Sequence, residues 1–142
     1  VVALQYRENA AYWAHVGDSR LYLLRKGALR RLTRDHSFVQ DLVERGSITE
    51  EEARNHPKKN LLTRAVGVEE KLVVDTGSFT IEEGDIFLLC SDGLTNMVGE
   101  AAIRETLQGE SADKARTLVE LALLAGGLDN ITAIVVECDE RG

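Results

Sequence analysis

The sequence IFLLCSDGLTNMV, residues 86–98, joins an apolar run to a carboxylate, Asp92, and a glycine, Gly93. A short apolar run bounded by turn residues is typical of a buried β-strand. Asp92 and Gly93 form either an ordinary turn after that strand or the point where the strand presents a ligand to a metal. Because Asp-Gly is a common turn dipeptide, this stretch alone leaves both interpretations open.

Strand patterns lie on both sides of this stretch. Residues 1–34 contain four short β-rich runs separated by turn residues, which predicts an antiparallel meander. Further strands are expected in residues 72–81 and 85–91, and a last strand in residues 131–138.

Helical patterns occupy the segments between these strands. Ser37 followed by Gln40 matches a capping box and predicts a short helix. Thr49 followed by Glu52 repeats the pattern for a second, more polar helix, which must end before Pro57 because the residue preceding proline disfavours helix.

Two more helices are expected near the C-terminal end of the sequence. The first covers residues 99–107, and the second covers residues 111–127 with Ser111 as its N-cap and Gly126 at its end. Strands and helices that come in runs, without strict alternation, predict the α+β class, with helices layered on antiparallel sheet.

Composition narrows the function classes. The chain has 142 residues, enough for one domain with a core of its own, and its formal net charge of −7 argues against nucleic acid as the main partner. No apolar stretch is long enough to span a membrane. Cys90 and Cys138 lie in separate apolar runs, which is typical of buried thiols in a reducing compartment, so we expect a cytoplasmic protein.

Three carboxylates differ from the many charged surface residues, because each stands at the end of an apolar strand pattern. They are Asp18, Asp92 and Asp129. If these strand ends converge, like charges meet without a cation, which opposes ionisation unless a metal compensates. Oxygen ligands without a cysteine or a clear histidine pair favour Mg²⁺ or Mn²⁺ over zinc. Each aspartate taken alone is more simply a turn residue, so the metal hypothesis depends on convergence.

Four motifs distributed along the whole chain can be compared with known families. They are AHVGDSRLYLLRKGALRRLTRDHS, LLTRAVG, LLCSDGLTNMV and GGLDNITAIVV. In this order and at these separations they resemble the bacterial branch of the metal-dependent protein phosphatases (PPM, type 2C). The resemblance implies a β-sandwich flanked by helices in four layers (α/β/β/α), with two Mn²⁺ or Mg²⁺ ions between the sheets. The ions would activate a water that attacks phosphoserine or phosphothreonine.

The resemblance also implies roles for single residues. Asp92 would ligate the first catalytic metal and face a third, weaker site, Asp129 would complete the first metal's ligands, and Asp18 would hold the third metal. No further catalytic side chain is expected. Hydrogen bonds from neighbouring residues orient such ligands, and the residues implied to do so are Ser91, Gly93 and Asn130.

Residues 37–60 correspond to the flap of the family, a mobile segment beside the cleft that influences substrate choice. Asp35 and His36 stand where the sheet leads into this flap, and we expect both to be structural, with Asp35 capping or bonding the backbone.

Several family motifs do not occur in the sequence: an arginine that binds phosphate, a Glu-Asp pair and a DGMGG-like segment. Residues 1–142 therefore resemble the C-terminal part of a phosphatase domain. We expect the isolated chain to be inactive or nearly so, and its sheet edges to favour self-association. The expected partners are phosphoprotein substrates, with a serine/threonine kinase as counterpart. The alternative function is a non-catalytic regulatory or pseudo-phosphatase module that binds a partner protein.

Overall fold

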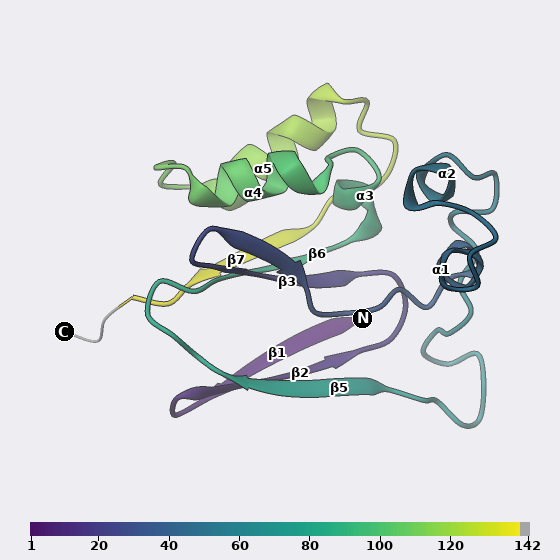
Figure 1. Cartoon of the computed structure of the whole chain (residues 1–142), viewed down its shortest axis with the longest axis horizontal. Helices are drawn as coiled ribbons and strands as arrows, with labels where there is room; N and C mark the ends of the chain where they lie inside the picture. The colour runs from purple at the N-terminus through teal and green to yellow at the C-terminus, as the bar shows by residue number, and fades with distance from the viewer. Residues whose placement is uncertain (140–142) are drawn as a thin grey trace.

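Two antiparallel sheets lie face to face in the computed structural model, which describes residues 1–139, and helices cover the second sheet (Figure 1). The first sheet has the order β1-β2-β5, with β1 Val2–Arg7, β2 Ala10–His15 and β5 Asp75–Thr80. The second has the order β4-β3-β6-β7, with β3 Arg20–Arg25, β4 Ala28–Arg31, β6 Ile86–Cys90 and β7 Ala133–Glu137. The predicted α+β class with antiparallel sheets is confirmed.

The chain passes from one sheet to the other between β2 and β3, so the predicted continuous meander is wrong at this point. β2 pairs with β1 and β5, whereas β3 pairs with β4 and β6. The physical reason lies in β3 itself, where Leu21, Tyr22, Leu23 and Leu24 are all buried. A strand that is apolar on both faces needs cover on both sides, and only the second sheet lies between helices and another sheet.

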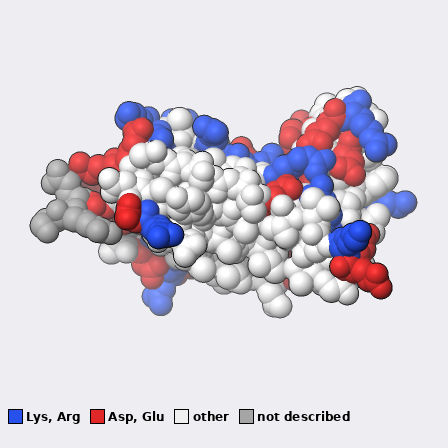
Figure 2. Space-filling model, turned by 90° about the horizontal axis from the view of Figure 1, so that it is seen from below, with Lys and Arg blue, Asp and Glu red and all other residues white. Residues whose placement is uncertain are grey.

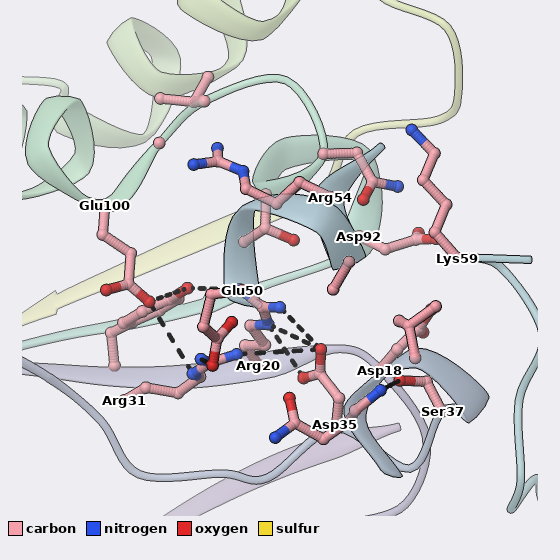
Figure 3. A pocket seen from close by; sticks show the side chains of 18 of the residues that line it. Asp18, Arg20, Arg31, Asp35, Ser37, Glu50, Arg54, Lys59, Asp92 and Glu100 are labelled. Atoms are coloured by element: carbon pink, nitrogen blue, oxygen red, sulfur yellow. Dashed lines mark hydrogen bonds and ion pairs between the residues drawn. The ribbon is translucent and has the colours of Figure 1, made fainter. Parts of the chain in front are cut away.

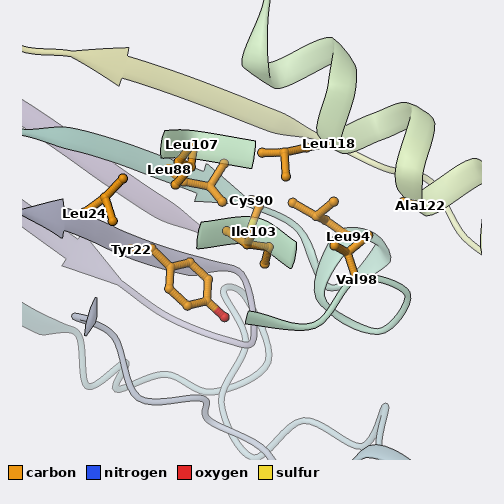
Figure 4. Close-up of a cluster of buried hydrophobic side chains, with 10 residues drawn as sticks. All are labelled: Tyr22, Leu24, Leu88, Cys90, Leu94, Val98, Ile103, Leu107, Leu118 and Ala122. Carbon is orange, nitrogen blue, oxygen red and sulfur yellow. The ribbon is translucent and has the colours of Figure 1, made fainter. Parts of the chain in front are cut away.

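The two faces of the second sheet build two cores. Leu21, Leu23 and Phe87 pack between the sheets. The other face packs under α3 Asp92–Thr95, α4 Glu100–Gln108 and α5 Lys114–Leu124 (Figure 4). The buried side chains of this larger core are Tyr22, Leu24, Leu88, Cys90, Leu94, Val98, Ile103, Leu107, Leu118 and Ala122. Each large apolar side chain buried there contributes about 1.5–3 kcal/mol, which anchors β6 and the residues that follow it.

The start of α5 differs from the prediction. The N-cap is Asp113, whose side chain accepts a hydrogen bond from the Arg116 N–H at 2.9 Å. Ser111 lies outside the helix and its hydroxyl accepts from the Asp113 N–H at 3.3 Å. Both residue types are good caps, and the helix begins at the one nearer its apolar stripe.

The helices α1 Phe38–Glu44 and α2 Glu50–Arg54 lie together beyond one end of the sheets (Figure 1). Both predicted N-caps are present, but only the second forms the full capping box. The Ser37 hydroxyl accepts from the Gln40 N–H while the Gln40 side-chain amide donates to Glu44, and Thr49 and Glu52 form both halves of a capping box. Within the two helices, burial is confined to Val39 and Ala53.

The first sheet turns one face away from the second. Ala3, Tyr12, Thr76 and Ser78 are exposed on its strands, and Figure 2, viewed from this side, shows a broad surface of uncharged residues with charge gathered toward the ends. In residues 1–139, α3, α4 and α5 cover the second sheet and no helix covers the outer face of the first, so three of the four implied layers are described (Figure 1). None of the helices in the described range is long and apolar enough to cross a membrane.

Candidate metal centre

A cavity of about 510 Å³ lies between the α1–α2 segment and the adjacent end of the second sheet (Figure 3). Its walls carry charges of both signs. The charged residues that line it are Asp18, Arg20, Arg31, Asp35, Glu50, Arg54, Lys59, Asp92 and Glu100.

Asp18 enters this cavity at the point where the chain crosses between the sheets. Burial, together with the nearby carboxylates of Asp92 and Asp35, raises the pKa of Asp18 to about 6. None of the ion pairs within residues 1–139 includes Asp18 or Asp92. Two neighbouring carboxylates without a paired cation are the donor set that a hard divalent ion fits.

Asp92 and Asp129 occupy different positions relative to this cavity. Asp92 is the first residue of α3 and lines the cavity beside Asp18. Asp129 is exposed in the loop before β7 and lines a neighbouring cavity of about 130 Å³. The two cavities share Lys59 and Asn96. The structure therefore brings Asp18 and Asp92 to one cavity and Asp129 to the next.

Hydrogen bonds join the segments that carry Asp92 and Asp129. The Ser91 N–H donates to the Thr132 carbonyl oxygen, and the Thr132 N–H donates to the Ser91 hydroxyl oxygen, both at 3.0 Å. The Ser91 hydroxyl also reaches the Asn130 carbonyl oxygen at 3.5 Å. These contacts fix where each aspartate leaves the end of its strand.

Gly93 is needed for a reason other than the expected tight turn. It lies within α3, and a Cβ atom at this position would overlap the carbonyl oxygen of Asn130. The absence of a side chain therefore allows α3 to approach the loop before β7, which a local sequence pattern does not reveal.

Asp35 supports the cavity through a partner that the sequence analysis did not anticipate. Its carboxylate accepts hydrogen bonds from Nε and Nη2 of Arg20, the shortest at 2.9 and 2.7 Å, so the expectation that it caps or bonds the backbone is wrong. Arg20 also donates to the Tyr22 hydroxyl at 2.9 Å. Asp35 is buried, and a bidentate pair with arginine provides the compensation that a buried carboxylate requires.

His36 has the structural setting that was expected. Its Nδ1 accepts the Gly17 N–H at 3.0 Å, and its own backbone N–H donates to the Gly17 carbonyl oxygen at 2.8 Å. Its Nε2 lies 2.7 Å from an Asp75 carboxylate oxygen, and Arg64 donates to the other oxygen of Asp75 at 3.0 Å. Asp75 and Arg64 were missed by the sequence analysis, since they are 39 and 28 residues from His36 with no motif joining them.

His15, His36 and Asp75 form another group with metal-binding atoms, which lie within 4.8 Å of one another. Arg64 already supplies a cation to Asp75, because its Nη1 donates to that carboxylate at 3.0 Å. Burial, and then the neighbouring His36, lower the pKa of His15. Both ring nitrogens of His15 are buried without a hydrogen-bond partner in the described part of the chain, so the polar groups of this cluster are only partly satisfied.

Comparison with known proteins identifies the family. The family described as Protein phosphatase 2C matches residues 1–131. Protein phosphatase PhpP of Streptococcus pneumoniae is 45% identical over 136 residues, which cover 94% of this chain and 55% of PhpP. The serine/threonine phosphatase stp of Listeria monocytogenes is 47% identical over 141 residues, covering 98% of this chain and 56% of stp. The chain thus spans little more than half the length of these relatives.

Solved structures agree with this result. The Mycobacterium tuberculosis serine/threonine phosphatase PstP/Ppp superposes with a TM-score of 0.91 at 42% identity, over 98% of this chain and 59% of PstP/Ppp. Stp1 from Staphylococcus aureus gives a TM-score of 0.93 at 35% identity, over 98% and 56% of the two chains. The chain therefore belongs to the protein phosphatase 2C family, as its four motifs indicated.

Proposed function

We propose that this chain provides the C-terminal part of a metal-dependent protein serine/threonine phosphatase, with Asp18, Asp92 and Asp129 as its metal ligands. The observation that carries the proposal is the pairing of Asp18 and Asp92 on one cavity without a cation partner. A relative supports the choice of ion, since the catalytic domain of PstP, 41% identical with a TM-score of 0.88, has been solved in complex with two manganese ions.

Mn²⁺ or Mg²⁺ bound by these carboxylates would activate a water for direct attack on a phosphoserine or phosphothreonine. The chain's own residues then serve to hold the carboxylates in place. The Ser91–Thr132 hydrogen bonds fix the ends of β6 and β7. The Arg20–Asp35 hydrogen bonds restrain two side chains that line the cavity.

We assign the role of flap to residues 37–60. This segment forms one wall of the cavity, and its Arg54 and Lys59 line the cavity together with Asp18 and Asp92 (Figure 3). Neither residue takes part in an ion pair within the described range. Two cations without an ion-pair partner in the cavity lining suit an anionic phosphoprotein segment, which supports phosphoproteins as substrates. A kinase counterpart and a cytoplasmic location remain predictions.

The same two cations favour the second candidate function, a module that binds phosphoprotein without hydrolysing it. A chimera distinguishes the two functions. In it, the 136 residues that match PhpP replace their PhpP counterparts, so that PhpP supplies the remainder of its own length. The phosphatase proposal predicts Mn²⁺-dependent hydrolysis of a phosphothreonine peptide that Asp92→Asn lowers by about 100-fold or more.

Glu70→Gln is the matched control, because Glu70 is an exposed carboxylate outside the cavity and should leave the rate unchanged. A folded chimera that binds the peptide but does not hydrolyse it would favour the binding module and contradict the phosphatase proposal.

The isolated chain should behave differently from the chimera. The resemblance assigns its three candidate aspartates to the first catalytic metal and to the third site, which leaves the second catalytic ion without an assigned carboxylate among the described residues. We expect no more than trace hydrolysis of p-nitrophenyl phosphate with Mn²⁺. Substantial hydrolysis that depends on Asp92 would show that the site in this chain is already complete.

A further inference from the structure

We propose that His36 and Asp75 are positioning residues for Asp18: together they fix the backbone from which the Asp18 carboxylate enters the cavity. This inference rests on the proposed function, in which Asp18 is a metal ligand. His36 and Asp75 themselves lie outside the residues that line the cavity.

His36 holds Gly17 at both of its backbone polar groups. The Gly17 N–H donates to His36 Nδ1 at 3.0 Å, and the Gly17 carbonyl oxygen accepts the His36 N–H at 2.8 Å. The first bond fixes the peptide plane before Gly17, and the second fixes the plane that leads into Asp18. Since two fixed planes leave the intervening residue no freedom to rotate, the position of the Asp18 backbone follows from His36.

Both groups are shielded from water, so the hydrogen bonds have no ready substitute. His36 is 0% exposed and Gly17 is buried. Gly17 also has φ +108°, a conformation that other residues rarely adopt. The chain can pass from β2 to Asp18 by this route only while a partner satisfies the Gly17 N–H, because an unpaired buried N–H is costly.

Asp75 determines which nitrogen of His36 can accept this bond. Nδ1 accepts a backbone N–H and therefore carries no proton, so the neutral ring carries its proton on Nε2 and donates it to Asp75. The Asp75 carboxylate, held by Arg64 at 3.0 Å, can only accept. Asp75 thus favours the tautomer whose Nδ1 is free to accept from Gly17. The same arrangement orients histidines beside metal sites in other proteins.

His15 limits the remaining freedom of the ring. The His15 and His36 rings lie 4.8 Å apart, centroid to centroid, at an angle of 34°. His15 is itself 1% exposed. Rotation of the His36 ring would therefore have to displace a second buried ring.

The test compares two substitutions of His36 in the 142-residue chain. His36→Leu removes the acceptor, whereas His36→Asn places the Asn side-chain oxygen where Nδ1 accepts. We expect His36→Leu to weaken Mn²⁺ binding, measured by calorimetry, on the order of tenfold, and His36→Asn to recover most of it. Hydrogen exchange at the Gly17 amide should be fast in His36→Leu and slow in His36→Asn.

Asp75 is tested in the same way. Asp75→Asn keeps an oxygen that accepts the Nε2 proton and should keep the Mn²⁺ affinity, while Asp75→Ala should lower it. In the unsubstituted chain, ¹⁵N spectra of His36 should show the proton on Nε2. A proton on Nδ1 would overturn the proposal, and this measurement requires no metal.

Thr33→Val is the matched control, because the Thr33 hydroxyl also accepts a buried backbone N–H, that of Leu21, at 3.1 Å. It should lower the melting temperature without changing Mn²⁺ affinity. If His36→Leu behaves like this control, the role of His36 is structural only and the proposal is wrong. If Asp18→Asn does not weaken Mn²⁺ binding, the proposed function fails at Asp18, and Gly17 exchange and the His36 tautomer then decide the positioning role alone.

Discussion

At the scale of single residues, Asp18 shows most clearly how the proposed metal binding conflicts with stability. Its carboxyl is half-buried beside Asp92 and Asp35, and these surroundings raise its pKa to about 6. The pKa of an unfolded aspartate is about 3.9. The folded chain therefore binds a proton more tightly than the unfolded chain, and the stabilisation from that proton is lost as the pH rises through 6.

Asp18→Asn tests how much stability the fold loses when the Asp18 carboxylate is ionised. In the presence of a chelator, the unsubstituted chain should be more stable at pH 5 than at pH 7, and Asp18→Asn should be the more stable of the two at pH 7. Denaturant unfolding at both pH values measures the difference. Equal stability of the two chains at pH 7 would show that Asp18 is not under electrostatic strain.

Residue-scale prediction from the sequence depended on local signals. Asp18 and Asp92 were singled out because each follows an apolar strand pattern, and the expected convergence holds in that both line the same cavity, while their binding of a metal stays a prediction. Asp75 and Arg64 carried no such signal, since their role arises from contacts with a distant histidine. The position of Asp129 on a neighbouring cavity also depends on loop geometry that spacing does not encode.

At the scale of elements, the contact between α3 and the loop before β7 decides how closely Asp92 and Asp129 approach. Gly93 makes that contact, because any Cβ there would overlap the Asn130 carbonyl oxygen. The Ser37 and Thr49 caps and the strands were predicted, since a cap or an apolar run acts within a few residues, whereas the cap of α5 is Asp113 and the predicted Ser111 was wrong. The sheet to which β3 belongs was not predicted, because the pattern of apolar and polar residues along one strand does not determine which strands pair with it.

Gly93→Ala should therefore lower stability by about 1–3 kcal/mol, as overpacking in a tight contact does. The displaced α3 should also weaken Mn²⁺ binding. Gly99→Ala is the comparison, since its Cβ would meet only the flexible guanidinium of Arg54, at 3.4 Å. Urea unfolding measures the stability of the two variants, and calorimetry measures their Mn²⁺ affinity. Equal losses of stability in Gly93→Ala and Gly99→Ala would contradict the importance of the Asn130 contact.

At the scale of the whole molecule, the uncovered face of the first sheet is the most distinctive surface. It is broad and uncharged, and β1 and β5 form the edges of this sheet (Figure 2). Open edges and neutral faces favour association. We expect light scattering of the isolated chain to show oligomers that grow with concentration. A single monomeric species at high concentration would contradict this expectation.

The proposed metal site depends on all three scales, because a residue, its loop and the meeting of two sheets together place Asp92 beside Asp18. Calorimetric titration of the chain with Mn²⁺ tests this directly. Asp92→Ala should bind Mn²⁺ about tenfold or more weakly, while its circular dichroism stays that of a folded chain, because Asp92 forms no ion pair in the described residues. An Asp92→Ala chain that binds Mn²⁺ as tightly as the unsubstituted chain would contradict the metal assignment.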